Sequence, residues 1–161
     1  MRMLILGTGA LGCVYAARLA AYADVTVLGT WAEGVDAIRD AGIRVTDPDG
    51  QTWTARVRAE HDPEAVAPAD IALILVKSYQ TRRAAGWAAR LLAKDGLAVT
   101  LQNGLDNLPV LVEAVGASHA AVGVTYNAAT LLGPGMVRHV VSLPTYLSLA
   151  AQPAGAAPTQ L

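Results

Sequence analysis

The sequence lacks phenylalanine and has few other aromatic residues, so aliphatic side chains must build its core. It also has a single cysteine, Cys13, which excludes an internal disulfide and is typical of a reducing compartment. No histidine or second cysteine accompanies Cys13 to make it reactive, so we expect it to be a small buried hydrophobic residue.

Net charge and long apolar runs are scarce as well. The net charge is −1 and the basic residues are scattered, which gives no electrostatic indication of a nucleic-acid or anionic-membrane partner. The longest aliphatic run, Ile71 to Val76, is far too short to span a bilayer, and the N-terminus lacks a signal-peptide pattern. We therefore expect a cytoplasmic protein with no nucleic-acid and no membrane partner.

The stretch that organises the chain is its N-terminus. Residues 3–6 form a short apolar run typical of a buried parallel strand, and helix-forming residues at 10–23 precede a second apolar run at 25–28. Between strand and helix lies a GxGxxG motif, spelled by Gly7, Thr8, Gly9, Ala10, Leu11 and Gly12. This strand, turn, helix and strand context is the one that a dinucleotide-binding interpretation of the motif requires.

Each glycine of the motif has a predicted mechanical role. Gly7 permits a tight exit from the strand, and Gly9 has no side chain to keep the backbone away from a pyrophosphate. Gly12 lets the helix pack closely on the sheet. The amide groups at the helix N-terminus then face the phosphates, so no basic side chain is needed there.

The tip of the second strand bears on the choice of cofactor. An acidic residue there is typical of NAD sites and a basic residue of NADP sites, whereas this chain has Leu28, Gly29, Thr30 and Trp31. Thr30 is a candidate hydrogen-bond donor to a phosphate, while Arg39 and Arg44 are more typical of solvated surface charges. The missing carboxylate favours NADP, with NAD as the alternative.

A β-hairpin is predicted after the helix that we expect at 30–41. Residues 43–45 and 52–57 are β-prone and flank a turn at 47–50. We expect this hairpin on the edge of the parallel sheet. His61 follows it without a cluster of other metal ligands, so we expect a surface histidine and no metal site.

Two later strands end abruptly in polar residues. The run at 71–76 ends at Lys77, and the run at 97–101 ends at Gln102 and Asn103, with a helix predicted at 80–93 between them. Carboxyl ends of adjacent parallel strands meet at one crevice, so Lys77 and Asn103 should face the glycine turn. Alone, Lys77 is more typical of a solvated cap and Asn103 of a turn, so only the pair at adjacent strand ends supports a site.

The C-terminal part departs from a repeated strand and helix pattern. A helix at 105–115 is followed by strand-like segments at 120–125, 127–131, 136–141 and 146–149. We place His139 on the exposed face of one of these strands. The predicted fold is α/β, with a Rossmann-type, doubly wound, mainly parallel sheet and extra C-terminal β-strands over residues 1–150, and a linker or disordered tail at 151–161.

Several motifs together resemble the ketopantoate reductase family. They are GTGALG, VKSYQT with Lys77, LQNG with Asn103, GVTYNAA with Thr125 and Ala129, and GPGMVRH, in family order from residue 1 to about residue 149. The resemblance implies reduction of 2-dehydropantoate to pantoate with NADPH, on the route to pantothenate. It implies that the GxGxxG residues hold the pyrophosphate, that Lys77 and Asn103 contact cofactor and keto acid substrate, and that Ala129 lies against the cofactor.

Two departures from the family accompany this resemblance. Family members commonly carry an arginine near the second strand tip, where this chain has Thr30 and Trp31. The family also has an all-helical second domain that supplies the lysine proton donor, and this chain ends where that domain would begin. We therefore expect a chain that binds nucleotide but reduces ketopantoate poorly by itself, and that self-associates or forms a homodimer through exposed apolar surface.

Two alternatives remain at this point. One is a reductase of another 2-keto or hydroxy acid, because the family's substrate contacts lie largely in the domain that is absent here. The other is a Rossmann module that binds a nucleotide without catalysis. The presence of Lys77 and Asn103 counts against the module, since a sensor needs only the phosphate turn.

Overall fold

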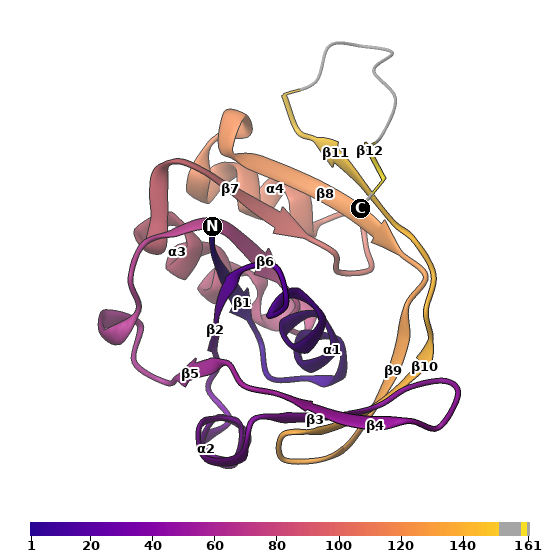
Figure 1. Cartoon of the computed structure of the whole chain (residues 1–161). Helices are drawn as coiled ribbons and strands as arrows, with labels where there is room; N and C mark the ends of the chain where they lie inside the picture. The colour runs from indigo at the N-terminus through magenta and orange to yellow at the C-terminus, as the bar shows by residue number, and fades with distance from the viewer. Residues whose placement is uncertain (152–158, 161) are drawn as a thin grey trace.

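The main sheet sets the frame of the molecule. The structure is a computed structural model that describes residues 1–151 and 159–160. The strands of the main sheet are β1 (Arg2–Leu6), β2 (Asp24–Leu28), β5 (Arg58–Glu60), β6 (Ala69–Ile74), β7 (Leu92–Thr100), β8 (Ala120–Thr125), β11 (Thr145–Leu149) and β12 (Thr159–Gln160). Their order across the sheet is β12-β11-β8-β7-β6-β1-β2-β5, and the strands from β8 to β5 are parallel to one another (Figure 1). This order confirms the predicted Rossmann-type sheet.

Helices cover both faces of this sheet. They are α1 (Ala10–Leu19), α2 (Ala32–Ala41), α3 (Thr81–Leu91) and α4 (Asn107–Val115), with short 3-10 turns η1 (Pro63–Ala65), η2 (Ser78–Gln80) and η3 (Ala117–His119). Successive side chains of β1 alternate between the two cores: Met3 and Ile5 pack with α1, whereas Leu4 and Leu6 pack with α3 and α4. A strand buried on both faces has no polar side, which explains the continuous apolar run.

A second sheet of four strands covers the outer side of α1. It is formed by β3 (Ile43–Thr46), β4 (Thr52–Ala55), β9 (Ala128–Gly133) and β10 (Met136–Val141), in the order β4-β3-β10-β9. The predicted hairpin is confirmed, because β3 and β4 pair antiparallel. Its predicted place is wrong: β5 occupies the edge of the main sheet beside β2, whereas β3 pairs with β10. Buried Ile43 and Val45 belong to the core beneath α1, and this packing draws the hairpin away from the main sheet.

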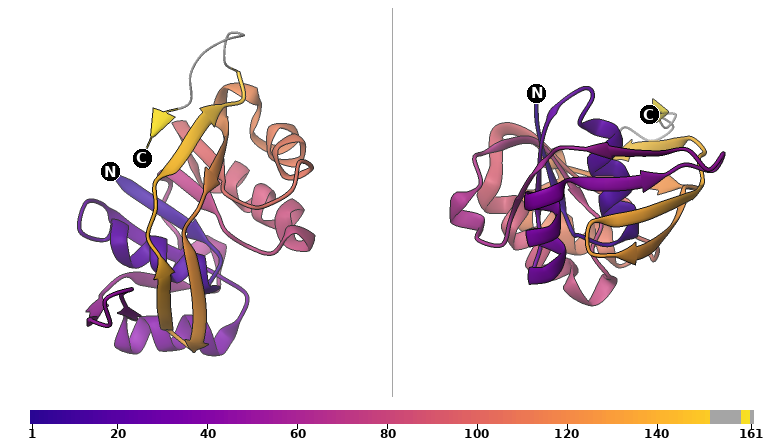
Figure 2. Two further views of the ribbon diagram at one scale, coloured as in Figure 1. Left: turned by 90° about the vertical axis from the view of Figure 1, so that its right-hand side faces the viewer. Right: turned by 60° about the horizontal axis from the view of Figure 1, so that its bottom comes forward.

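Two long ribbons of chain connect the sheets. One runs from β8 into β9 and the other from β10 into β11, so each passes from one sheet to the other (Figure 2). The crossing points are the short connections at 126–127 and 142–144. These connections carry part of the site described below.

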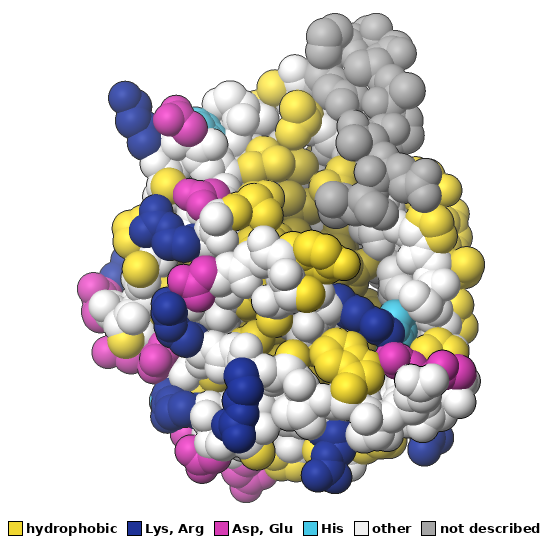
Figure 3. Space-filling view, viewed as in Figure 1, with side chains coloured by type: hydrophobic (Ala, Val, Ile, Leu, Met, Phe, Trp, Pro, Cys, Tyr) yellow, Lys and Arg dark blue, Asp and Glu magenta, His cyan; other side chains and the backbone are white. Residues whose placement is uncertain are grey.

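The remaining predictions about organisation have mixed outcomes. The predicted tail at 151–161 lies outside the described residues except for Ala151 and residues 159–160, and stays a prediction. None of the helices that the structure describes is long and apolar enough to cross a membrane. On the face shown in Figure 3, basic and acidic side chains are interspersed, and no large field of one sign is visible (Figure 3).

Candidate functional site

The glycine turn between β1 and α1 has the geometry of a phosphate cradle. A Cβ atom on Gly12 would lie 2.1 Å from the carbonyl oxygen of Gly7, so only glycine lets the helix approach the turn this closely. Gly7 has a φ of +124°, which side chains rarely tolerate. A Cβ on Gly9 would meet nothing within 4 Å, so the backbone there faces open space. Gly9 also caps α1 without a side-chain hydrogen bond, and no acidic residue lies in the first turn of the helix.

The turn opens into a cavity of about 700 Å³ at the carboxyl ends of the parallel strands. All predicted site residues except Gly12, which lies behind the turn, line this cavity: Gly7, Thr8, Gly9, Ala10, Leu11, Thr30, Lys77, Asn103 and Ala129. They come from β1, the β2 tip, the loops after β6 and β7, and β9. The sequence prediction that Lys77 and Asn103 share one crevice with the glycine turn is confirmed.

A network of partly buried polar side chains holds the loops that carry Lys77 and Asn103. Gln102 donates from Nε2 to the carbonyl oxygen of Val76 at 2.8 Å and to Oγ1 of Thr81 at 2.9 Å. The Thr81 hydroxyl donates to Oδ1 of Asn107 at 2.8 Å, and Asn107 Nδ2 donates to the carbonyl oxygen of Asn103 at 2.9 Å. This network of hydrogen bonds therefore fixes the loop after β6 relative to the loop after β7.

Positive charge dominates the lining of the cavity. Lys77 and Arg83 line it, and no carboxylate does among the described residues. Neither cation forms an ion pair within the part of the chain that the structure describes. The Arg83 guanidinium lies 5.8 Å from the ring centre of Trp87, which also lines the cavity. Two free cations without an acidic neighbour suit a ligand with several negative charges.

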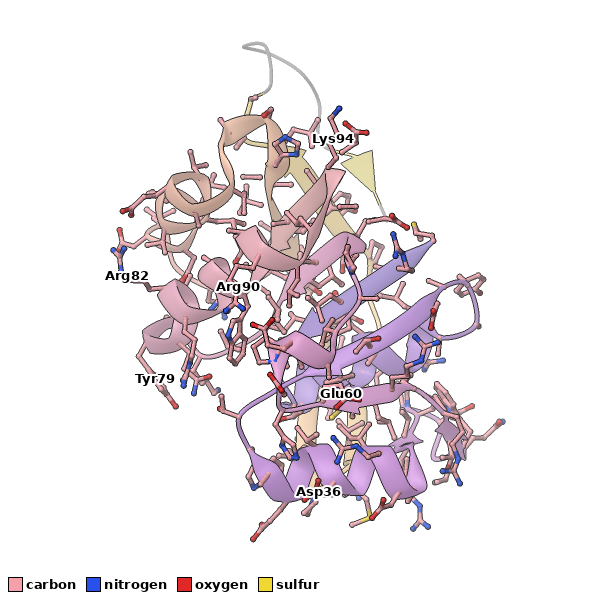
Figure 4. The ribbon with its side chains drawn as sticks, turned by 90° about the vertical axis from the view of Figure 1, so that its left-hand side faces the viewer. Asp36, Glu60, Tyr79, Arg82, Arg90 and Lys94 are labelled. Atoms are coloured by element: carbon pink, nitrogen blue, oxygen red, sulfur yellow. The ribbon has the colours of Figure 1, made fainter. Side chains whose placement is uncertain are left out.

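Arg83 was missed by the sequence analysis. Its neighbour Arg82 projects outward from α3 and pairs with Glu113 at 3.4 Å (Figure 4). Arg39 pairs with Asp36 and Glu60 on the surface, as expected of a solvated charge, and does not line the cavity. The available signal was a basic residue in the first turn of α3, which begins shortly after Lys77 at the same edge of the sheet, but Arg82 shares this signal.

Another part of the cavity wall is neutral and hydrogen-bonded. Thr125 and Asn127 line it beside Ala129. The Thr125 hydroxyl lies 2.7 Å from the Tyr15 hydroxyl, and Asn127 Nδ2 donates to Thr125 Oγ1 at 3.0 Å. Behind them lies His139, which is 2% exposed, so its predicted place on an exposed face is wrong. The polar partners of its ring compensate for its burial.

Two other predictions for titratable residues can be compared with the structure. Cys13 is fully buried as expected, and burial raises the pKa of its thiol to about 12. His61 lies on the surface with Nε2 3.2 Å from Asp36 Oδ1. No group of three or more potential metal ligands gathers among the described residues.

The chain is similar to known proteins in sequence. The model of the ketopantoate reductase PanE/ApbA family matches residues 3–152. A 2-dehydropantoate 2-reductase of Halobacterium salinarum is 42% identical over 143 residues, which are 86% of this chain and 46% of that protein. The chain thus spans less than half the length of this relative.

Solved structures agree with this match. A PanE/ApbA family ketopantoate reductase from Ralstonia eutropha JMP134 has a TM-score of 0.78 at 37% identity, over 86% of this chain and 46% of that one. A D-mandelate dehydrogenase in a ternary structure with NADH and anilino(oxo)acetate has a TM-score of 0.82 at 25% identity, over 88% of this chain and 46% of that one.

Proposed function

Because the chain belongs to the PanE/ApbA ketopantoate reductase family, we propose that it forms the NADP(H)-binding part of a 2-dehydropantoate 2-reductase. The observation that carries the proposal is the single cavity shared by the glycine turn, Lys77 and Asn103. The chemistry of its lining fits a dinucleotide, because it combines a side-chain-free turn, two cations and no carboxylate among the described residues.

The pyrophosphate would lie against the glycine turn. The backbone amides at the start of α1 are free to donate hydrogen bonds to an anion, and the helix dipole adds roughly half a positive charge there. Gly9 leaves the approach open because a Cβ there would meet only empty space.

Arg83 and Thr30 support NADP over NAD. Both line the cavity, and Thr30 stands at the β2 tip where NAD sites carry the acidic ribose ligand. A carboxylate there would repel a 2′-phosphate, whereas a threonine hydroxyl and an unpaired guanidinium attract it. We therefore assign the 2′-phosphate of NADP(H) to Arg83 and Thr30.

Lys77 and Asn103 would hold the keto acid and the adjacent part of the cofactor. The Lys77 ammonium provides a point charge for a carboxylate, and the Asn103 amide offers both a donor and an acceptor for a carbonyl or hydroxyl. A bound nicotinamide would supply the hydride. Since this chain matches less than half of its relative, we propose that the proton donor lies in the other part of such proteins and that these 161 residues turn over slowly by themselves.

Nucleotide titration tests the proposal directly. NADPH fluorescence or calorimetry should show saturable binding to the chain, and Lys77→Ala should weaken keto acid binding while leaving most of the nucleotide affinity intact. A chain that binds neither NADPH nor NADH would overturn the proposed function. Enzyme-like turnover of ketopantoate by the 161 residues alone would overturn the assigned division of roles.

A second candidate function is reduction of another 2-keto acid. It is favoured by the similarity to the D-mandelate dehydrogenase, whose ternary structure contains NADH and a keto acid analogue, anilino(oxo)acetate. A panel of 2-keto acids assayed on a full-length family member that contains this chain separates the two candidates. Preference for an aromatic keto acid over ketopantoate would favour the second. If Lys77→Ala changes the binding of no ligand at all, the chain is a nucleotide-binding module without a substrate.

A further inference from the structure

His139 is a buried histidine whose ring is held at both nitrogens. Nε2 lies 3.0 Å from Oδ1 of Asn127, and Nδ1 lies 3.4 Å from Nη2 of Arg18. The residue is on β10, and Val137, two positions earlier, is buried on the same side of the strand. A fully buried imidazole with two directed partners is a built feature of the fold.

The contacts determine which nitrogen carries the proton. Asn127 Nδ2 donates to the carbonyl oxygen of Leu143 at 2.7 Å, and Asn127 Oδ1 accepts from the Leu143 amide at 3.3 Å, so the orientation of the Asn127 amide is fixed. Oδ1 can only accept, so His139 Nε2 donates to it. Arginine can only donate, so Nδ1 is the unprotonated acceptor. These two contacts therefore favour a neutral His139 with its proton on Nε2, and a backbone hydrogen bond with Val141 is a further contact of the ring.

The second sheet keeps Arg18 in place behind the ring. Arg18 pairs with Asp47 in the turn between β3 and β4, and its guanidinium lies 5.0 Å from the ring centre of Trp53. The indole nitrogen of Trp53 donates to Asp47 Oδ2 at 2.9 Å. Asp47 and Trp53 hold the Arg18 guanidinium in place, so that an N–H group and the positive charge of Arg18 face His139 Nδ1.

Asn127 lies in the connection between β8 and β9, and Leu143 lies in the connection between β10 and β11, where the chain passes between the two sheets. The Asn127 side chain bonds both the amide and the carbonyl of Leu143, and its backbone amide donates to Thr125 Oγ1 at 3.1 Å. The connection between β8 and β9 is thereby tied to the connection between β10 and β11. Because Thr125, Asn127 and Ala129 line the cavity, this tie sets the position of that wall.

We propose that His139 is a positioning residue that holds the wall formed by Thr125, Asn127 and Ala129 and so orients the nicotinamide end of the bound nucleotide. The inference rests on the proposed function. In a sheet of this topology the adenosine ribose lies at the β2 tip, so the other half of the dinucleotide extends past the turn toward the ends of β7 and β8. The wall at residues 125–129 is on that side of the cavity.

Two variants separate a positioning role from simple packing. His139→Leu removes both ring hydrogen bonds, whereas His139→Gln keeps a donor and an acceptor on one side chain. His119→Leu is the matched control, because the His119 ring donates one hydrogen bond from Nδ1 to the Gly96 carbonyl oxygen at 2.9 Å, in η3 at the amino end of β8.

The ligands are NADPH and 2′-phosphoadenosine diphosphoribose, which lacks the nicotinamide. His139→Leu should weaken NADPH binding about three- to tenfold, the effect of one lost neutral hydrogen bond, and leave the shortened ligand nearly unchanged. His139→Gln should restore most of the NADPH affinity, and His119→Leu should alter neither. In His139→Leu, hydrogen exchange at the Leu143 amide should become faster, and nitrogen NMR of the wild type should show the proton on Nε2.

The opposing outcomes are distinct. Equal weakening of both ligands, no weakening of either, or a proton on Nδ1 in the wild type would overturn the inference. If His139→Leu does not fold, His139→Gln and the wild-type spectrum still test the inference. A folded His139→Gln chain with normal Leu143 exchange that loses affinity for NADPH but not for the shortened ligand would count against the inference. A wild-type chain that binds neither ligand would overturn the proposed function, while Leu143 exchange would still show whether His139 holds the wall.

Discussion

Replacing Arg83 by alanine is the sharpest test of cofactor choice. Arg83 lines the cavity together with Thr30, has no ion-pair partner among the described residues and is the assigned ligand of the 2′-phosphate. NADPH and NADH differ only by that phosphate. Arg83→Ala should therefore weaken NADPH binding and leave NADH binding almost unchanged.

The size of the effect follows from the exposure of Arg83. A hydrogen bond to a charged group contributes about 1.5 to 3 kcal/mol, but solvent screening of an exposed guanidinium lowers this to about 1 to 2 kcal/mol. NADPH binding should therefore weaken about five- to thirtyfold. Because the interaction is screened by salt, the difference between wild type and variant should shrink as ionic strength rises.

The assay is parallel titration of NADPH and NADH, with Arg82→Ala as control. Arg82 is the preceding residue on the same helix, but it pairs with Glu113 on the surface and does not line the cavity. Its loss should change neither affinity, since an exposed pair contributes little. Equal weakening of NADPH and NADH in Arg83→Ala, or the same effect in Arg82→Ala, would refute the assignment.

Four further predictions concern the turn, two buried titratable residues and the exposed surface. Gly9→Ala should abolish most nucleotide binding at unchanged thermal stability, whereas Gly12→Ala should also lower stability, because its Cβ would lie 2.1 Å from a backbone oxygen. Burial and the Arg18 charge lower the pKa of His139 below 6.5, while Asp47 and a backbone hydrogen bond with Val141 in part oppose them. The unfolded chain then binds more protons than the folded chain at acidic pH, so the free energy of unfolding should fall as the pH drops below about 6.5. His139→Gln should reduce this dependence in denaturant titrations. Thiol reagents should label Cys13 far more slowly in the native than in the denatured chain, because burial raises its thiol pKa to about 12. Large apolar side chains are exposed along the ribbons from β8 to β11, so sedimentation should detect self-association, and a monomer at all concentrations would contradict this.

The parts of the fold that the sequence predicts well are those determined locally. The turn at Gly7 to Gly12 and the polar residues after β6 and β7 follow directly from apolar runs that stop at glycine or at a polar side chain. Parallel strands end at one edge, so Lys77 and Asn103 could be placed in the same crevice. The pairing of β3 with β10 could not be predicted, because it joins segments about ninety residues apart and depends on the apolar outer side of α1.

The rotation of α3 and the alternation of side chains in β10 explain why Arg83 was missed and His139 was placed on the wrong face. Thr81, Ala84 and Ala85 form the buried side of α3, so Arg82 and Arg83 lie on opposite flanks of it, and sequence alone does not say which flank meets the cavity. In β10 the alternation was recognisable, but the buried side holds Val137 and His139 while Arg138 faces outward. A polar residue shares the core side here because Asn127 and Arg18 satisfy its ring.

The lining of the cavity differs in charge from one part to another for a physical reason. Lys77 and Arg83 offer positive charge where phosphate or carboxylate groups would bind, whereas the wall at Thr125 and Asn127 is neutral. A protonated His139 behind that wall would disfavour an oxidised nicotinamide, whose ring is itself cationic. Arg18 opposes that protonation by placing a donor and a positive charge at Nδ1. On the proposed function, the neutral tautomer would thus keep this wall compatible with both redox states of the nicotinamide.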